Sequence, residues 1–291
     1  MAVLARQAYH ASFVATIKGE CVTIGGVTDA RPIIEVLVLG SGTSHGVPMI
    51  GCDCPVCTSG DPKDSRTRPS IWIRVGKTCL LIDTAPELRL QCVTHGVKRV
   101  DAVLFTHHHA DHVAGLDDLR RFNHLSGRAL PCYGAARTLD RLQRMFAYAF
   151  VAESDSPHSR PQLDLHPVEP APFTIGDAHI VPIPLMHGPL PVLGFRLGRF
   201  AYCTDCNHIP ESSLALLTGL DVLILDALRH TPHPTHFNLE QAVAMAQQIG
   251  ARQTYFTHLT HQLGHQRTNA QLPAGMALAH DGLRFLVPAE G

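Results

Sequence analysis

Short apolar runs recur along the chain, and polar side chains follow several of them directly. Such runs, bounded by polar or glycine-rich segments, predict buried strands. The predicted strands span residues 33–39, 70–75, 78–83, 102–105, 178–184, 192–197, 200–204, 220–226, 253–256 and 283–287. Apolar positions with helical spacing predict helices over residues 86–95, 117–123, 135–149 and 239–249. Strands combined with helices in this way are typical of an α/β protein.

The densest group of polar side chains follows the predicted strand 102–105. His107, His108, His109, Asp111 and His112 lie within six consecutive residues. On an extended backbone alternate side chains face the same side, so His107 and His109 should point together and His108 away. Neutral imidazole and carboxylate are ligands of zinc-type metals. The pattern predicts a metal site at this strand end, and the alternative is a polar loop in a chain that holds 20 histidines.

A second candidate metal site lies in the cysteine-rich segment that contains Cys52, Cys54 and Cys57. Three thiolates this close together can bind one zinc ion, and a tetrahedral site then needs a fourth ligand from elsewhere. His261 is our candidate for that ligand. The nine cysteines are an odd number in a chain too long to need disulfides for stability. They favour a reducing compartment, and we expect a cytoplasmic protein.

Composition restricts the class of partner. The 291 residues are 45% hydrophobic, which supports a full core, and the formal net charge is −1. A charge this small gives no global field to attract nucleic acid or an anionic membrane. No apolar run approaches the roughly 18 residues of a membrane span. We interpret residues 1–31 as an N-terminal appendage and residues 32–291 as the catalytic domain, and the sequence leaves a homodimer open.

The predicted helix 135–149 has a basic face. Arg137, Arg141 and Arg144 follow one another at i, i+4 and i+7 spacing, which places them on one side of a helix. A face of this kind is usually a solvated surface. The alternative is that the arginines help to admit an anionic substrate.

The pattern H-x-H-x-D-H, followed in order by His187, Asp205 and His258, resembles the signature of the metallo-β-lactamase superfamily. The resemblance implies an αββα sandwich, in which two mixed sheets are flanked by helices. It also implies two metal ions. By this resemblance the first ion is held by His107, His109 and His187, the second by Asp111, His112 and His258, and Asp205 bridges them.

Within the superfamily the chain is most similar to the phosphoribosyl 1,2-cyclic phosphate phosphodiesterase family. The resembling segments are Gly40–Thr43, Gly46–Pro48, Gly51–Cys57 and Thr257–His261. In that family a structural zinc takes the early cysteines and the second histidine of the late motif, which implies Cys52, Cys54, Cys57 and His261 here. His236, just before a predicted helix, resembles the histidine that protonates the leaving group. The resemblance therefore assigns catalysis to His236 and to Asp111.

The expected function is hydrolysis of a small cyclic phosphate such as phosphoribosyl 1,2-cyclic phosphate, with two catalytic Zn²⁺ ions, for which Mn²⁺ is the alternative, and one structural Zn²⁺. Aspartate rather than cysteine at position 205 argues against a typical β-lactamase. The alternatives are hydrolysis of a thioester, a lactone or an RNA end, and a metal-binding sensor without turnover. We interpret Asp83 as the hydrogen-bond partner of a ligand histidine, and the alternative is a turn residue at the end of a strand. Asp226 either orients a ligand or caps a loop.

Overall fold

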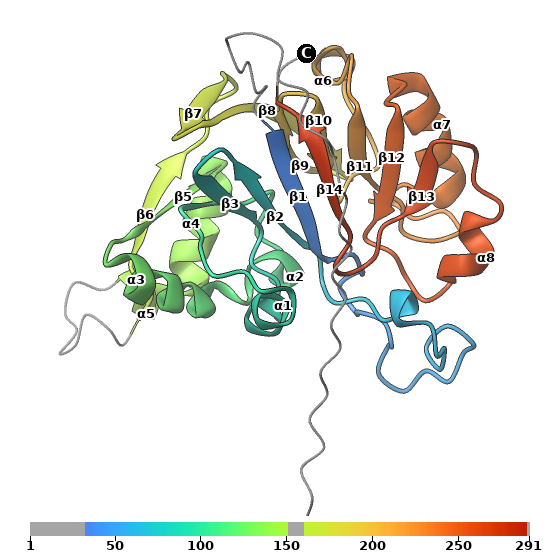
Figure 1. Ribbon diagram of the computed structural model, residues 1–291, viewed down its shortest axis with the longest axis horizontal. Coiled ribbons are helices and arrows are strands. Elements are labelled where there is room, and N and C mark those ends of the chain that lie inside the picture. The colour runs from blue at the N-terminus through green and yellow to red at the C-terminus, as the bar shows by residue number, and fades with distance from the viewer. Residues whose placement is uncertain (1–32, 151–159, 290–291) are drawn as a thin grey trace, which may run out of the picture. The chain divides into compact units, whose positions relative to one another are not determined.

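Residues 33–150 and 160–289 are described by the computed structural model, and they fall within one compact unit, Arg31–Gly291. The predicted appendage, residues 1–31, is outside the described residues. The described residues form a pair of seven-stranded sheets that face each other, and helices cover their outer faces (Figure 1). The predicted αββα sandwich is confirmed.

Each sheet contains a run of parallel strands. The strands of the first sheet, in order across it, are β14 (Arg284–Pro288), β1 (Ile33–Gly40), β2 (Ser70–Val75), β3 (Thr78–Ile82), β4 (Ala102–Leu104), β5 (Leu130–Gly134) and β6 (Leu163–Pro167). Those of the second are β13 (Met276–Leu278), β12 (Gln253–Thr257), β11 (Val222–Asp226), β10 (Phe200–Cys203), β9 (Leu190–Leu197), β8 (Ala178–His187) and β7 (Phe173–Ile175). β3 to β6 are parallel, and so are β10 to β13. The carboxyl ends of parallel neighbours meet at one edge of a sheet, so side chains that follow them converge.

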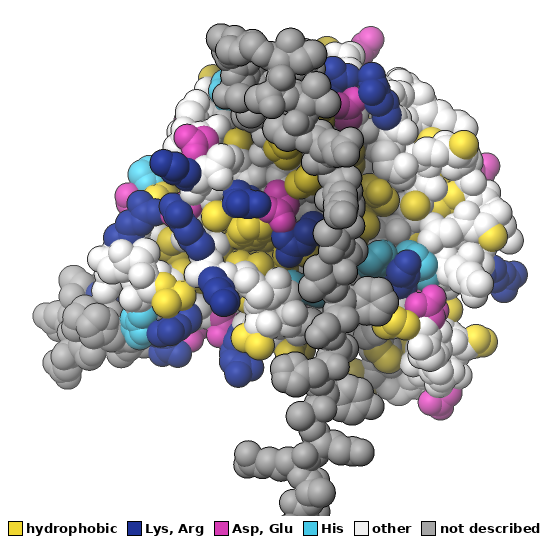
Figure 2. Space-filling model, in the orientation of Figure 1, with side chains coloured by type: hydrophobic (Ala, Val, Ile, Leu, Met, Phe, Trp, Pro, Cys, Tyr) yellow, Lys and Arg dark blue, Asp and Glu magenta, His cyan; other side chains and the backbone are white. Residues whose placement is uncertain are grey.

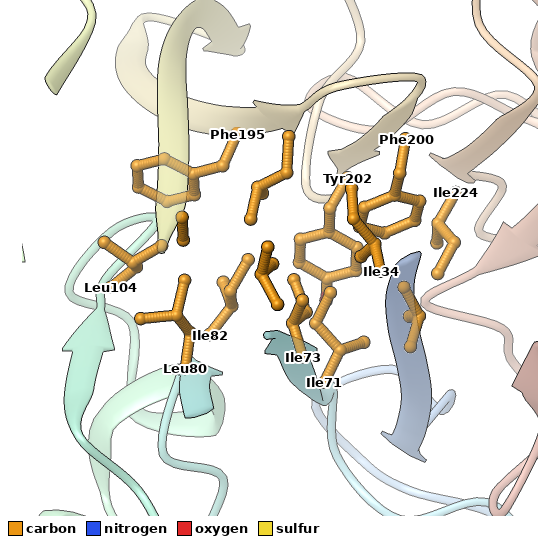
Figure 3. Close-up of a cluster of buried hydrophobic side chains, with 14 of the residues drawn as sticks. Ile34, Ile71, Ile73, Leu80, Ile82, Leu104, Phe195, Phe200, Tyr202 and Ile224 are labelled. Carbon is orange, nitrogen blue, oxygen red and sulfur yellow. The ribbon is translucent and has the colours of Figure 1, made fainter. Parts of the chain in front are cut away.

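Alternation along the strands divides the core into three layers. In β1, Val36 and Val38 belong to the core between the sheets, whereas Leu37 and Leu39 pack under the outer helices. Figure 3 shows the central layer, in which side chains of both sheets meet: Ile34, Ile71, Ile73, Leu80, Ile82, Leu104, Phe195, Phe200, Tyr202 and Ile224. Burial of a large apolar side chain contributes about 1.5–3 kcal/mol, so this layer is a main source of stability.

Helices cover the outer face of each sheet. On the first sheet side these are α1 (Leu88–His95), α2 (Ala110–Val113), α3 (Arg120–Ser126), α4 (Ala136–Met145) and α5 (Ala147–Phe150), with the 3-10 helix η2 (Leu116–Leu119). On the second they are α6 (Glu211–Leu216), α7 (Leu239–Ile249) and α8 (His265–Asn269), and a further 3-10 helix, η1 (Pro62–Asp64), precedes β2. A capping box starts α7: the Asn238 side chain accepts from the Gln241 amide, and the Gln241 side chain accepts from the Asn238 amide.

The element boundaries differ from the predicted ones in several places. The helix predicted over 135–149 is two helices, because Phe146 leaves the helical region with φ −118° and ψ 42°. The helix predicted over 117–123 begins as η2 and continues as α3. β8 extends through His187, so this residue ends the strand instead of following it. The prediction missed β5, β7 and β13, of which β7 and β13, with three residues each, are too short to show a period-two pattern.

Charged side chains of both signs occur on the face that Figure 2 draws. On the face drawn in Figure 2, Lys and Arg side chains are separated by acidic and hydrophobic ones and do not form a continuous basic surface. Among the described residues, none of the helices is long and apolar enough to cross a membrane.

Candidate metal centre

Three strand ends with an unusual backbone conformation mark the site. Asp83, Asp205 and His258 follow β3, β10 and β12, and their φ angles are 62°, 52° and 62°. They are the non-glycine residues with positive φ among the described residues. This conformation costs a side-chain-bearing residue of order 1 kcal/mol or more, and it persists where the surroundings hold it in place. All three side chains are directed into one polar cluster between the sheets' edges, as the contacts below establish.

The first group of potential ligands consists of His107, His109, His187 and Asp205. One ligand-capable atom of each lies within 4.8 Å of the others. The Nδ1 atom of His187 lies 2.8 Å from the Thr235 carbonyl oxygen, to which it donates, and this leaves Nε2 with its lone pair. The Nε2 atom of His107 is buried without a hydrogen-bond partner, 3.7 Å from Asp205 Oδ2.

The second group consists of Asp111, His112, His258 and, again, Asp205, whose ligand-capable atoms also lie within 4.8 Å of one another. Asp205 Oδ1 is 3.1 Å from His112 Nε2, and Asp205 Oδ2 is 3.2 Å from His258 Nε2. Asp111 Oδ2 lies 3.4 Å from each of these two imidazole nitrogens. Asp205 is therefore the member that the two groups share.

Asp83 and Thr106 fix the orientation of two of these histidines from behind. Asp83 Oδ2 is 2.7 Å from His112 Nδ1 and accepts the Thr106 hydroxyl at 2.7 Å. Thr106 Oγ1 in turn lies 3.0 Å from His107 Nδ1, from which it accepts. Both histidines consequently present Nε2 to the cluster, which is the role predicted for Asp83.

These donor atoms have the spacing that metal ions require. Nitrogen and oxygen ligands at about 2.0–2.2 Å from a tetrahedral zinc are about 3.3–3.6 Å apart. The separations from 3.1 to 3.7 Å given above agree with this value. The buried Nε2 atoms of His107 and His112 have no hydrogen-bond partner, which a metal ion would supply. The residues thus fit two divalent ions that share Asp205.

The electrostatics of the cluster also favour added positive charge. Burial lowers the pKa of His107 well below its usual value, which keeps the imidazole in its neutral, ligand form. Burial raises the pKa of Asp205, but the nearby imidazoles of His112 and His258 outweigh it and hold this pKa well below its usual range. Burial lowers the pKa of His258, but Asp205 and Asp111 raise it to about 10. The carboxylates therefore stabilise cations at this position, whether protons on imidazole or metal ions.

His236 belongs to neither of these two groups, but with Asp226 and His258 it forms a further set whose ligand-capable atoms lie within 4.8 Å of one another. Its ring centroid lies 4.5 Å from that of His187 and 4.6 Å from that of His258. Its Nδ1 is 3.2 Å from Asp226 Oδ1, so Nδ1 donates there and Nε2 is the nitrogen left for a substrate. The fully buried Asp226 also accepts the backbone amides of Phe237 at 3.1 Å and Asp205 at 3.2 Å. Of the two roles left open for Asp226, the structure favours orientation, and the residue oriented is His236.

The predicted cysteine site is brought together by segments that are far apart in the sequence. The Sγ atoms of Cys52, Cys54 and Cys57 lie 3.1, 3.3 and 3.7 Å from His261 Nδ1. Sulfur and nitrogen ligands of a tetrahedral zinc are about 3.6 Å apart, which these distances bracket. Hydrogen bonding from the Cys57 amide is the largest effect on Cys54 and lowers its pKa to about 6, which favours the thiolate. The four side chains fit one closed metal site.

Two contributors to the metal centre were not predicted from the sequence. The Thr106 hydroxyl links Asp83 to His107, and the Thr235 carbonyl orients His187. A backbone carbonyl leaves no trace in a residue pattern, so Thr235 could not have been found. Thr106 stands directly before the histidine motif. Its position between a predicted strand and a predicted ligand was the one feature of the sequence that could have indicated a role at the site.

Comparisons with known proteins agree with this geometry. A family model described as a β-lactamase superfamily domain matches residues 78–259. A curated protein of Porphyromonas gingivalis (strain ATCC BAA-308 / W83), named octanoyltransferase, is 38% identical over 264 residues, covering 89% of this chain and 52% of that protein. The chain thus spans about half the length of that relative. A coenzyme PQQ synthesis protein B of Methylobacterium radiotolerans is 29% identical over 224 residues, covering 66% of this chain and 72% of that protein.

Solved structures extend the likeness over most of the chain. The crystal structure of a new diphosphatase from the PhnP family is 44% identical with a TM-score of 0.82, and the match covers 88% of this chain and 97% of that one. The structure of Zn²⁺-bound PqqB from Methylobacterium extorquens is 20% identical with a TM-score of 0.71, and the match covers 86% of this chain and 99% of that one. At that identity the second likeness shows the fold alone.

Proposed function

The chain belongs to the β-lactamase superfamily, and on that premise we propose that it is a dinuclear-metal phosphodiesterase that hydrolyses a small phosphate ester. Membership and fold make it a hydrolase of the metallo-β-lactamase fold. The observation that carries the finer proposal is the position of Asp205, whose two carboxylate oxygens face both ligand groups. A shared carboxylate between two imidazole-rich groups suits a pair of divalent metals.

In this proposal His107, His109 and His187 would hold one ion, Asp111, His112 and His258 would hold the other, and Asp205 would serve both. Zinc is favoured because imidazole dominates the ligand set, and manganese is the alternative. When bound, the metals supply Lewis-acid activation of water and stabilisation of charge on the phosphoryl oxygens. Cys52, Cys54, Cys57 and His261 hold a separate structural zinc, which leaves no position open for substrate.

His236 acts as general acid in this mechanism. A phosphodiester bond to an alkoxide breaks slowly unless the departing oxygen receives a proton, and a histidine can hold that proton near neutral pH. Asp226 accepts from His236 Nδ1 and so keeps the proton-carrying Nε2 on the side of the ligand cluster. The rings of His187 and His258 on either side limit rotation of the His236 ring.

The proposed substrate is small and anionic. The 44% identical neighbour is described as a diphosphatase, which supports a phosphoryl substrate for this chain as well. A ribose cyclic phosphate, such as phosphoribosyl 1,2-cyclic phosphate, remains our specific proposal. The formal net charge of −1 disfavours a long nucleic acid, because affinity for a polyanion depends on many Lys and Arg contacts.

A second candidate is hydrolysis of an acyl thioester, and one finding favours it. The curated relative that matches 89% of the chain is named for octanoyl transfer, although the chain spans only 52% of its length. The activated water that would attack phosphorus in a dinuclear site can also attack a carbonyl carbon.

One preparation tests both candidates. Metal-quantified protein should hydrolyse bis(p-nitrophenyl) phosphate and a ribose cyclic phosphate, and His109→Ala should abolish turnover because it removes a ligand. Cleavage of octanoyl thioesters without any phosphodiester cleavage would replace the first candidate with the second. Turnover of neither class by fully metal-loaded protein would leave the metal-binding sensor as the better description.

A further inference from the structure

The Thr204 hydroxyl lies beside the metal centre, but the proposed reaction gives it no role. Thr204 directly follows β10, and its side chain is fully buried. Along β10, Phe200 and Tyr202 face the layer between the sheets, whereas Ala201 and Cys203 pack on the outer side of their sheet. Alternate residues of a strand face the same side, so Thr204 is the next residue of the inner series. Its side chain is therefore directed between the sheets, towards the ligand cluster.

Thr204 is hydrogen-bonded to the carboxylate that both ligand groups share. Its Oγ1 lies 2.8 Å from Asp205 Oδ1, to which it donates, because a carboxylate can only accept. The same Oδ1 lies 3.1 Å from His112 Nε2. The other oxygen, Oδ2, lies 3.7 Å from His107 Nε2. The hydroxyl thus holds the oxygen that faces the second ligand group and leaves Oδ2 for the first.

The backbone of Asp205 is fixed by contacts that do not fix its carboxylate. The Asp205 amide donates to Asp226 at 3.2 Å, and the residue has a φ of 52°. The torsion that turns a carboxylate about its Cβ–Cγ bond has only broad preferences. Among the described residues, the Thr204 hydroxyl is the one donor to this carboxylate outside the imidazoles of the cluster. An imidazole that presents the lone pair of Nε2 as a ligand donates nothing there, so the orientation of the carboxylate then depends on Thr204.

We propose that Thr204 is a positioning residue, which holds the Asp205 carboxylate in the orientation that gives each metal one oxygen. This inference rests on the proposed function, in which Asp205 serves both ions. A carboxylate can bind one ion through one oxygen or through both. If the Asp205 carboxylate could turn, it would offer both oxygens to the ion that binds first, and the position for the other ion would lose a ligand. The Thr204 hydroxyl therefore determines how tightly the chain holds the second ion.

Retention of zinc by the fully loaded chain tests the proposal. The chain is equilibrated with chelator buffers that set the free Zn²⁺ concentration, and the zinc retained per chain is counted by elemental analysis. Thr204→Val keeps the branched shape of the side chain but removes the hydroxyl. It should lose one ion at a free Zn²⁺ concentration about 10- to 100-fold higher than the native chain does, which is the usual cost of losing a contact that orients a metal ligand. The other catalytic ion and the zinc of the cysteine site should be retained as in the native chain.

Two further substitutions at this position show whether the hydroxyl itself is responsible. Thr204→Ala also lacks the hydroxyl and should lose the same ion, so it decides the question if Thr204→Val does not fold. Thr204→Ser retains the hydroxyl and should hold both ions as the native chain does.

Thr257→Val is the matched control. Thr257 is also a buried threonine that directly precedes a proposed ligand with positive φ, in this case His258. The Nδ1 atom of His258 is buried and has no hydrogen-bond partner in the described parts of the chain, so the Thr257 hydroxyl does not orient this ring. Thr257→Val should therefore retain zinc as the native chain does, although it replaces a buried threonine by valine in the same way.

Four results would overturn the proposal. They are native-like retention of both ions by Thr204→Val or Thr204→Ala, equal weakening of both ions, failure of Thr204→Ser to hold the second ion, and a native chain that holds only one ion besides the zinc of the cysteine site.

The zinc measurement also separates this inference from the proposed function. A native chain that holds two ions with this dependence on Thr204, but cleaves no phosphodiester, refutes the phosphodiesterase and retains the positioning role. A native chain that cleaves bis(p-nitrophenyl) phosphate, while Thr204→Val holds both ions equally well, retains the phosphodiesterase and refutes the positioning role.

Discussion

Replacement of Asp226 by Asn tests whether this buried carboxylate acts through His236. The substitution keeps the shape of the side chain but converts one accepting oxygen into an NH2 group. If the NH2 group takes the place of Oδ2, it faces the Phe237 amide, 3.1 Å from Oδ2, and His236 Nδ1, 3.2 Å from Oδ1, keeps only a neutral amide oxygen as its acceptor. If the NH2 group takes the place of Oδ1, His236 Nδ1 loses its acceptor. In either orientation His236 loses the charged acceptor that holds its proton-carrying ring in place for the leaving oxygen.

The size of the effect follows from the contact that is lost. A hydrogen bond to a charged group contributes about 1.5–3 kcal/mol, which corresponds to about 10- to 150-fold in rate if it orients the acid only in the transition state. His236→Ala removes the acid itself and should cost about 10²–10⁴-fold. If Asp226 acts through His236, the double variant should be no slower than His236→Ala, because the two losses are one effect.

The assay uses the leaving group to separate acid catalysis from damage to the metal centre. A ribose cyclic phosphate releases an alkoxide and needs the proton, whereas bis(p-nitrophenyl) phosphate releases p-nitrophenolate and does not. Both variants should slow the first substrate far more than the second, with unaltered metal content. Asp221→Asn is a control at the opposite end of β11 from Asp226, where the carboxylate pairs with Arg199 at 3.0 Å.

Equal slowing of both substrates by Asp226→Asn would refute this reasoning. Asp226 also accepts the Asp205 amide at 3.2 Å, so such a result would assign it to support of Asp205, the proposed bridging carboxylate. If the rate losses of the two single variants add up in the double variant, Asp226 does not act through His236.

Three further predictions concern metals and pH. Asp205→Ala should lower metal occupancy and turnover together, and retention of two tightly bound metals with full activity would show that the bridge is misassigned. Cys54→Ser should remove one metal per chain by elemental analysis and lower Tm more than Cys79→Ser, a buried cysteine outside the site. Burial lowers the pKa of His265 to about 4 from 6.5, so the folded chain binds fewer protons between these values. The contribution of neutral His265 to stability should be fully present above pH 6.5. The free energy of unfolding should fall by up to about 3 kcal/mol as the pH drops to 4. His265→Gln should flatten this fall in urea titrations, and an unchanged slope would contradict the prediction.

Many of the strands and helices, and the histidine motif of the metal centre, followed from local sequence pattern, whereas His187, Asp205 and His258 were implied by the resemblance to the superfamily. The apolar run at residues 33–39 predicted the buried strand β1, and the structure shows which of its side chains face each layer. The spacing of His107 and His109 predicted that they point together, and the structure places their rings 4.5 Å apart. The spacing of the cysteines likewise predicted a zinc site, because three thiolates this close together are typical of metal ligands.

The tertiary structure alone decided the roles that depend on contacts between distant segments. Asp226 had two open interpretations, and its contact with His236 follows from where the loop before α7 returns to the end of β11. The parallel pairing of β4 with β5 likewise determines that α4 follows the strand next to the one that leads into the histidine motif. The sequence records the period of each element but not the order of strands in a sheet. That order is set by the packing of all the elements at once, and it determines which strand ends, and therefore which side chains, meet.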